Sequence, residues 1–320
     1  MKHGHTIHWI LAGVGQGLQS PAGRSSITWE RRSQMATVRQ LLRQQADLYG
    51  VQFWIIEKDY ALSYLLAGIS ATEDLGDALV LKGGTALRKL YFRDYRFSED
   101  LDYSTRQIGP IEALDRKFDR AIKKTEDLLQ EFGPFRVAYE PLTLREPHPE
   151  GQSSYVVRVQ FPYQRAPMCR LKVEITIDEP ILLDLERRPI LHDFPESIVG
   201  KVSVYSLEEI VAEKLRALLQ SLARIEDRGW GTGRIPRDYY DLWYILKQTD
   251  LSGAQLVNLI QEKSNVRDVR AESADDFFAP ALQNIARRQW EKQLRIFVPA
   301  APPVEAVLEE TKTLVEMLWN

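Results

Sequence analysis

Only one cysteine, Cys169, occurs among the 320 residues, which excludes an internal disulfide framework and a thiolate zinc cluster. A single cysteine is typical of a reducing compartment, so we expect the protein in the cytoplasm. No apolar run reaches the roughly 18 to 20 residues that a membrane-spanning helix needs, and we expect no membrane partner. Neither sign of charge dominates, because 42 lysines and arginines face 45 aspartates and glutamates. Any basic surface for nucleic acid must therefore be local.

The chain is long enough for two domains or one large one, and its character changes twice along its length. The first 34 residues contain glycine, serine and histidine without a helical period, and they lack a small-x-small signal cleavage site. A helical pattern begins at Met35. We therefore predict a flexible or spurious leader at 1–34, an α+β domain at 35–200 and a helical domain at 201–320.

Hydrophobic periodicity predicts strands mainly in the first half of the chain and helices in the second. Helices are predicted at 38–49, 57–71, 85–92 (capped by Thr85), 109–131, 206–224, 236–248, 252–264, 273–297 and 304–320. Strands are predicted at 78–84, 98–104, 135–142, 153–163 and 169–178. Helices and strands that follow one another in separate runs are typical of the α+β class.

The stretch RFSEDLDYS at 96–104 contains three acids within four positions. On a strand, Asp100 and Asp102 project from one face, and Leu101 projects from the other. Two carboxylates on a rigid support, with positions left for water and phosphate, suit a divalent cation. An acid pair of this kind also occurs on ordinary solvent-facing strands, so the pair alone does not decide between the two interpretations.

The preceding sequence KGGTAL at 82–87 joins a predicted strand to a predicted helix. Gly83 and Gly84 have no Cβ, so a phosphate can approach the backbone N–H groups at the positive end of the helix. The motif is neither a P-loop nor a dinucleotide fingerprint. A glycine pair here is commonly only a turn. A phosphate cradle about 15 residues before a metal-binding acid pair is a more specific combination.

A third acid lies on the strand predicted at 169–178. Lys172, Glu174 and Thr176 alternate onto one face of this strand. If the strand lies beside that of Asp100, Glu174 completes a cluster of three carboxylates that can hold two metal ions. In the alternative interpretation, Lys172 and Glu174 only cover a solvated face of the sheet.

Two motifs in the helical half place charges beside an apolar stripe. SLEEIVAEKLRAL begins with a capping-box pattern from Ser206 to Glu209. It also contains Lys214 next to the buried stripe, where a lysine can reach a triphosphate as a point charge. RIPRDYYDLWYIL places Asp238 and Asp241 on one helical face. A surface arginine–aspartate pair is the plain alternative for this last motif.

The motifs LKGGTALRKLYF…RFSEDLDYS, LKVEI, SLEEIVAEKLRAL and RIPRDYYDLWYIL, in this order, closely resemble the AbiEii/AbiGii-type nucleotidyltransferase toxins. This family includes the mycobacterial MenT group and belongs to the DNA polymerase β-like superfamily. The resemblance covers roughly residues 57–248. It implies a polymerase β-like core with a mixed sheet, followed by an all-helical half. It also implies nucleotide transfer from an NTP to an acceptor, in studied members the 3′ end of tRNA, and a neighbouring antitoxin protein.

Carried over by position, the resemblance implies a role for each motif residue. The implied nucleotide-binding residues are Lys82, Gly83, Gly84, Thr85, Ser98, Arg234 and Asp238. The implied catalytic residues are Asp100, Asp102, Glu174, Lys214 and Asp241, and the first three of these hold Mg²⁺ or Mn²⁺. The chemistry of nucleotide transfer agrees with these implied roles. Metal ions lower the pKa of the acceptor hydroxyl and help basic groups neutralise the leaving pyrophosphate. We expect Lys82, Arg88 and Lys214 to be those groups, with Glu174 or Asp241 assisting deprotonation.

Two other functions stay open at this point. One is an enzyme of the same fold that modifies a protein hydroxyl or a small molecule. The other is a degenerate nucleotide-binding module without catalysis, against which the intact Asp100, Asp102 and Lys214 argue. The basic stretches RQWEKQLR and NVRDVR in the helical half offer local surface for an RNA acceptor.

Overall fold

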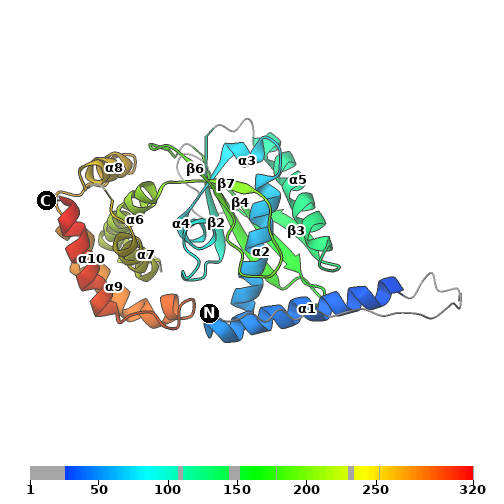
Figure 1. Cartoon of the computed structure of the whole chain (residues 1–320). Helices are drawn as coiled ribbons and strands as arrows, with labels where there is room; N and C mark the ends of the chain where they lie inside the picture. Colours follow the sequence, from blue (N-terminus) through cyan, green and yellow to red (C-terminus); the bar gives the residue numbers. More distant parts are fainter. Residues whose placement is uncertain are drawn as a thin grey trace, which may run out of the picture.

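Seven strands form one mixed sheet in the computed structural model of the protein, which describes residues 26–106, 111–143, 152–177, 179–229, 234–251 and 253–319 (Figure 1). The strands are β1 (Leu79–Lys82), β2 (Asp100–Thr105), β3 (Arg136–Pro141), β4 (Gln152–Gln160), β5 (Cys169–Thr176), β6 (Glu186–Pro189) and β7 (Lys201–Val204). Their order across the sheet is β3-β4-β5-β2-β1-β7-β6. β2 pairs with β5 in parallel and with β1 antiparallel, and β1 pairs with β7 in parallel.

Helices cover the sheet and then form a separate group at the end of the chain (Figure 1). Around the sheet lie α1 (Ser26–Tyr49), α2 (Phe53–Ser70), α3 (Leu75–Ala78), α4 (Gly83–Ala86), the π-helical turn η1 (Leu87–Tyr91) and α5 (Ile111–Gln130). The second group comprises α6 (Leu207–Arg228), α7 (Ile235–Gln248), α8 (Gly253–Asn265), η2 (Ala274–Phe278), α9 (Pro280–Trp290), η3 (Glu291–Arg295) and α10 (Val304–Trp319). The predicted α+β class with a helical C-terminal part is confirmed. None of the helices in the described ranges is long and apolar enough to cross a membrane.

Side-chain alternation gives the two faces of the sheet opposite characters. Leu101 on β2, Val173 on β5 and Tyr155 on β4 are successive partners across the sheet, and all three are buried. Tyr155 stacks on Phe118 of α5 with ring centroids 4.2 Å apart, so this face packs against α5 and its neighbour α2. Asp102 lies on the opposite face, which looks toward α6 and α7 (Figure 1).

The last strand of the sheet leads directly into the helical part. β7 extends the sheet past the domain boundary predicted near residue 200. Ser206 Oγ then accepts a hydrogen bond from the Glu209 backbone N–H at 3.2 Å, as the capping-box pattern predicted, and α6 begins. Neither β6 nor β7 was predicted, because four residues each are too few to show a period.

Two predicted boundaries differ from the structure. α1 begins at Ser26 and so reaches into the leader predicted at 1–34, of which residues 1–25 lie outside the described residues. The single helix predicted at 273–297 is wrong, because η2 ends and α9 begins anew at Pro280. Proline has no backbone N–H with which to continue an earlier helix, but it fits the first turn of a new one.

The contact between α2 and α5 leaves no room for a side chain at Gly68. A Cβ there would lie 2.0 Å from Thr125 Oγ1 and 2.9 Å from the backbone oxygen of Ala121. We expect Gly68→Ala to lower the free energy of unfolding by about 1–3 kcal/mol, as overpacking usually does. Urea denaturation followed by circular dichroism measures this change.

A double variant, Gly68→Ala with Thr125→Ala, separates side-chain from backbone crowding. We expect it to recover only part of the lost stability, because the Thr125 backbone nitrogen and the Ala121 oxygen still lie 2.9 Å from the new Cβ. An unchanged denaturation midpoint for Gly68→Ala would show that α2 and α5 separate without cost.

Candidate active site

A row of polar side chains crosses the sheet on the face toward α6 and α7. Lys82 on β1, Asp102 on β2 and Glu174 on β5 are successive partners in the strand register. Asp100 shares the face of Asp102 two residues earlier, as the alternation suggested. The strand of Glu174 lies beside theirs, which the sequence pattern had left open. The sheet thus brings four of the predicted residues together.

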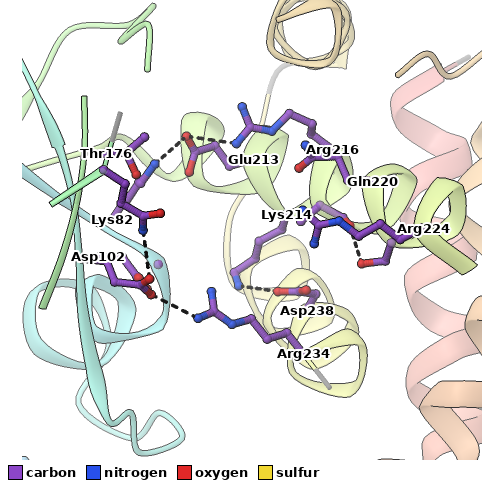
Figure 2. A pocket seen from close by; sticks show the side chains of 15 residues that line it. Lys82, Asp102, Thr176, Glu213, Lys214, Arg216, Gln220, Arg224, Arg234 and Asp238 are labelled. Atoms are coloured by element: carbon purple, nitrogen blue, oxygen red, sulfur yellow. Dashed lines mark hydrogen bonds and ion pairs between the residues drawn. The ribbon is translucent and has the colours of Figure 1, made fainter. Parts of the chain in front are cut away.

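A cavity of about 340 Å³ lies between this row and the helices α6 and α7 (Figure 2). Its walls come from two parts of the chain. The sheet side contributes Lys82, Gly83, Asp102, Gln152, Glu174 and Thr176. The helical side contributes chiefly Glu213, Lys214, Arg216, Gln220, Arg224, Arg234 and Asp238. The predicted residues outside this lining are Gly84, Thr85, Ser98, Asp100 and Asp241.

Asp100 and Asp102 are half-buried neighbours whose negative charges repel each other. Burial and then the charge of Asp102 raise the pKa of Asp100 to about 6. The charge of Asp102 also raises the pKa of Arg234, which extends over the pair from the start of α7. A divalent cation between the carboxylates would relieve their repulsion, and hard oxygen donors suit Mg²⁺ or Mn²⁺. The acid pair therefore fits a divalent metal.

The third carboxylate has other partners. Glu174 Oε1 accepts a hydrogen bond from Gln152 Nε2 at 2.9 Å and lies 2.8 Å from Lys172 Nζ. Its Oε2 lies 3.5 Å from Arg234 Nη2. Within the ranges that the structure describes, no group of three histidine, cysteine, aspartate or glutamate side chains could hold a metal. The predicted three-carboxylate cluster is not formed, because cations and an amide occupy both oxygens of Glu174.

The two glycines of the turn before α4 face different neighbours. Gly83 has a φ of 74°, which favours glycine, and a Cβ on it would lie 2.8 Å from Asp102 Oδ2. A Cβ on Gly84 would lie 2.5 Å from Arg96 Nη2. Gly83 therefore lines the cavity, whereas the Cα of Gly84 packs closely against the guanidinium of Arg96.

Thr85 and Ser98 are buried away from the cavity. The Thr85 hydroxyl donates to the backbone oxygen of Asp100, and α4 already begins at Gly83. The N-cap predicted at Thr85 is therefore wrong, and its hydroxyl is directed to the backbone of β2 and does not line the cavity. The hydrogen bond instead ties the glycine turn to the strand that carries the acids.

Arg88 lies in a separate buried cluster. Its Nη2 is 2.6 Å from Asp193 Oδ2, and its Nε is 3.5 Å from Asp59 Oδ1. Lys89 also contacts Asp59, at 2.5 Å. Because Arg88 does not line the cavity, it is not positioned to make the contact that the sequence had predicted with a triphosphate bound there.

Lys214 projects from α6 into the cavity and is held by two aspartates of α7 (Figure 2). Its Nζ is 3.1 Å from Asp238 Oδ1 and 2.5 Å from Asp241 Oδ2. Burial acts to lower the pKa of Lys214, but the charges of Asp241 and Asp238 outweigh this effect and raise it. The ammonium group thus stays charged, as a contact with a triphosphate requires.

Asp241 lies beneath the cavity with both oxygens occupied. Arg96 donates to it twice, from Nε to Oδ1 at 2.6 Å and from Nη2 to Oδ2 at 2.7 Å, and the Tyr95 hydroxyl also donates to Oδ1. Burial acts to raise the pKa of Asp241, but Arg96 and Lys214 outweigh it and lower the pKa to about 2. Such a carboxylate is a poor proton acceptor, so we reassign Asp241 from deprotonation to holding Lys214 in place.

Glu213 joins the sheet to the helical part. Its Oε1 lies 3.4 Å from Lys82 Nζ, 3.5 Å from Lys263 Nζ and 3.8 Å from Arg216 Nη2. Burial acts to raise the pKa of Glu213, but the charges of Lys82, Arg216 and Lys263 outweigh it and lower the pKa. Lys263 has no exposed surface and also lies 2.7 Å from Glu209 Oε1. The wall of the cavity is thus anchored in buried ion pairs.

Several lining residues were missed by sequence reasoning. Three of them follow Glu213 on α6 at successive intervals of three, four and four residues: Arg216, Gln220 and Arg224. A helical-wheel projection of α6 would have placed them on one face of the helix. No sequence pattern indicated Gln152 as a lining residue, because its position depends on the pairing of β4 with β5.

The model of the AbiEii family, described as a nucleotidyl transferase toxin of a type IV toxin–antitoxin system, matches residues 64–310. The chain belongs to this family. Its structure is also similar to that of MenT4, a nucleotidyltransferase toxin from Mycobacterium tuberculosis H37Rv. The TM-score is 0.53 at 20% identity, over 88% of this chain and 98% of the other. No curated protein matches the chain. The resemblance inferred from the motifs is confirmed, and the AbiEii match includes both walls of the cavity.

The ion pairs of Asp241 make the stability of this AbiEii member depend on pH. The carboxyl has an ordinary pKa of 3.8 and a folded-state pKa of about 2. Its ionised form therefore stabilises the fold above pH 3.8, and this contribution disappears as the pH falls toward 2. We expect Asp241→Asn to be less stable than the wild type at about pH 5, and the difference to shrink toward about pH 2, in urea denaturation.

Asp119→Asn provides the matched control, because Asp119 is exposed on α5. We expect its stability to follow that of the wild type at each pH. A difference between Asp241→Asn and wild type that stays constant over this range would contradict an ionised Asp241 in the fold.

Proposed function

We propose that this protein transfers a nucleotide from an NTP to an acceptor, with a divalent metal at Asp100 and Asp102. One observation carries the proposal: Asp102 of the acid pair meets buried cations from the sheet and α6 at one cavity, with Asp100 beside it on the same face of the sheet. Asp102 and Lys82 form one wall, and Lys214 forms the other. Membership in the AbiEii family supports the same activity.

In the proposed transfer, an oxygen of the acceptor hydroxyl forms a bond to the α-phosphorus of the NTP. The bond between that phosphorus and the pyrophosphate oxygen breaks, pyrophosphate leaves with the electron pair, and the hydroxyl proton passes to water. A bound Mg²⁺ or Mn²⁺ supplies positive charge that makes the hydroxyl more acidic and the pyrophosphate a better leaving group. Asp100 and Asp102 would hold this metal.

The side chains of the cavity bind and orient the triphosphate. Lys214 is fixed by Asp238 and Asp241 before any ligand arrives, so it meets a phosphate with little reorganisation. Arg224 and Arg234 are exposed at the cavity and can turn toward the phosphates. These cations add to the metal charge and oppose the negative charge that develops on the pyrophosphate.

The acceptor that we propose is the 3′ end of tRNA, as the resemblance to the family implies. We also propose a cognate antitoxin protein as partner, which the type IV toxin–antitoxin description of the family supports. NTPs and tRNA occur together in the cytoplasm, and a single buried cysteine agrees with that reducing compartment. We therefore place the reaction there.

Transfer can be measured with radiolabelled NTPs, Mg²⁺ and total tRNA. We expect label in RNA, and we expect Asp102→Asn to lower the rate by at least about 10²–10³-fold, the usual loss when one group that stabilises developing charge is removed. Its thermal unfolding should remain cooperative, because Asp102 is half-buried and contributes little packing. Asp119→Asn, an exposed aspartate on α5, should transfer at the wild-type rate.

Two results would point to the other functions. Label in a protein band or a small molecule, with none in RNA, would indicate an enzyme of the same fold with a different acceptor. Equal toxicity in cells of the wild type and an Asp100→Ala, Asp102→Ala variant would indicate a binding module without catalysis.

A further inference from the structure

A band of aromatic and basic side chains runs outward from the first of the two site aspartates, and it does not belong to the cavity. We call it the aromatic–basic band. It consists of four cation–ring pairs: Arg39 over Tyr163 (5.4 Å from cation to ring centroid), Arg43 over Phe53 (6.0 Å), Lys58 over Trp54 (5.2 Å) and Arg237 over Phe297 (4.4 Å). None of its members lines the cavity.

The rings of the band form two contacting pairs. Phe53 and Tyr163 have ring centroids 6.2 Å apart. Trp54 and Phe297 meet edge to face, also at 6.2 Å. Phe53 and Trp54 are consecutive residues at the start of α2, so this helix end contributes one ring to each pair. The band therefore draws on α1, α2, α7, the segment after β4 and the segment after η3.

Glu99 connects the inner end of the band to the acid pair. Lys58 Nζ lies 2.8 Å from Glu99 Oε1, and Arg237 Nη2 lies 3.4 Å from Glu99 Oε2. Glu99 immediately precedes Asp100, the first residue of β2. The band thus ends beside the aspartate that does not line the cavity, while Asp102 faces the cavity itself.

The outer end of the band carries exposed positive charge, and the charge of Arg39 also acts on the carboxyl of Glu57. Arg39 and Arg43 are exposed on α1 and form no ion pair within the described ranges. Phe53, Trp54 and Tyr163 are only half-buried. Exposed cations suit phosphates, and half-exposed rings or guanidinium planes suit stacked bases. This alternation matches single-stranded nucleic acid, whose bases and phosphates alternate in the same way.

We propose that the aromatic–basic band binds the single-stranded end of a polynucleotide acceptor and leads its terminal hydroxyl to Asp100. The inference rests on the proposed function, because it needs nucleotide transfer at Asp100 and Asp102. The NTP enters by the cavity at Asp102, so donor and acceptor approach the acid pair from different directions. In-line displacement at phosphorus requires this arrangement, since attacking and leaving oxygens lie on opposite sides.

Binding to a 5′-fluorescein single-stranded RNA with a free 3′ end, measured by anisotropy without NTP or metal, tests the band apart from catalysis. We expect Trp54→Leu to weaken binding by about fivefold to 150-fold, the range for losing one stacked base. The variant Arg39→Gln with Arg43→Gln should bind more weakly and reduce the slope of log affinity against log salt by about 1.4, as for two lost phosphate contacts.

Matched controls lie elsewhere on the surface. Trp243→Leu removes a half-exposed tryptophan of α7 that also has a lysine over its ring. Arg116→Gln with Arg120→Gln removes two exposed arginines of α5. We expect both to bind the RNA as the wild type does. Trp54→Phe keeps a ring and should retain most of the affinity, which separates stacking from a folding defect in Trp54→Leu.

Steady-state transfer assays complete the test. The band variants should raise the KM for RNA and leave the KM for NTP unchanged, because the cavity keeps all of its lining. Wild-type RNA affinity in both band variants would overturn the inference while the transfer reaction stands. A loss of binding to a partner protein at unchanged KM for RNA would also overturn it, since the band would then be a protein interface. If the wild type labels no RNA, the proposed function fails and the inference fails with it.

Discussion

The carboxylate of Asp241 fastens three segments that lie far apart in the sequence. Arg96 reaches it from the loop before β2, Lys214 from α6, and Asp241 itself stands on α7. Charges withdrawn from water lose their hydration, and removing one partner of a buried pair typically costs about 3–5 kcal/mol. The arrangement is therefore stable only when all partners are present, and the position of Lys214 in the cavity follows from it. Gly84 belongs to the same arrangement, because any side chain there would displace Arg96.

A second ionic contact, between Lys82 and Glu213, crosses from the sheet to the helical part. Apolar packing holds surfaces together without specifying one orientation, whereas ion pairs and hydrogen bonds are directional. The charged contacts at the cavity thus define how the two walls face each other. The apolar face of the sheet packs on α2 and α5, and it leaves the opposite face free for polar groups.

Local patterns in the sequence predicted those features that depend on neighbouring residues. Strand alternation placed Asp100 and Asp102 on one face, and the capping pattern located the start of α6. Tertiary partners were not predictable in this way. The pairing of Thr85 with a backbone oxygen and of Arg88 with Asp193 depends on segments that meet only after folding. The strands β6 and β7 were not predicted, because they contain too few residues to show an alternating pattern.

The two walls of the cavity emerge from the ribosome at different times. Translation completes β5, and with it the sheet side of the cavity, before α6 and α7 exist. A nascent chain of that length has its carboxylates but no lysine from α6 to oppose them. Both walls of the cavity are therefore present together only after α7 has been synthesised, late in the translation of the chain.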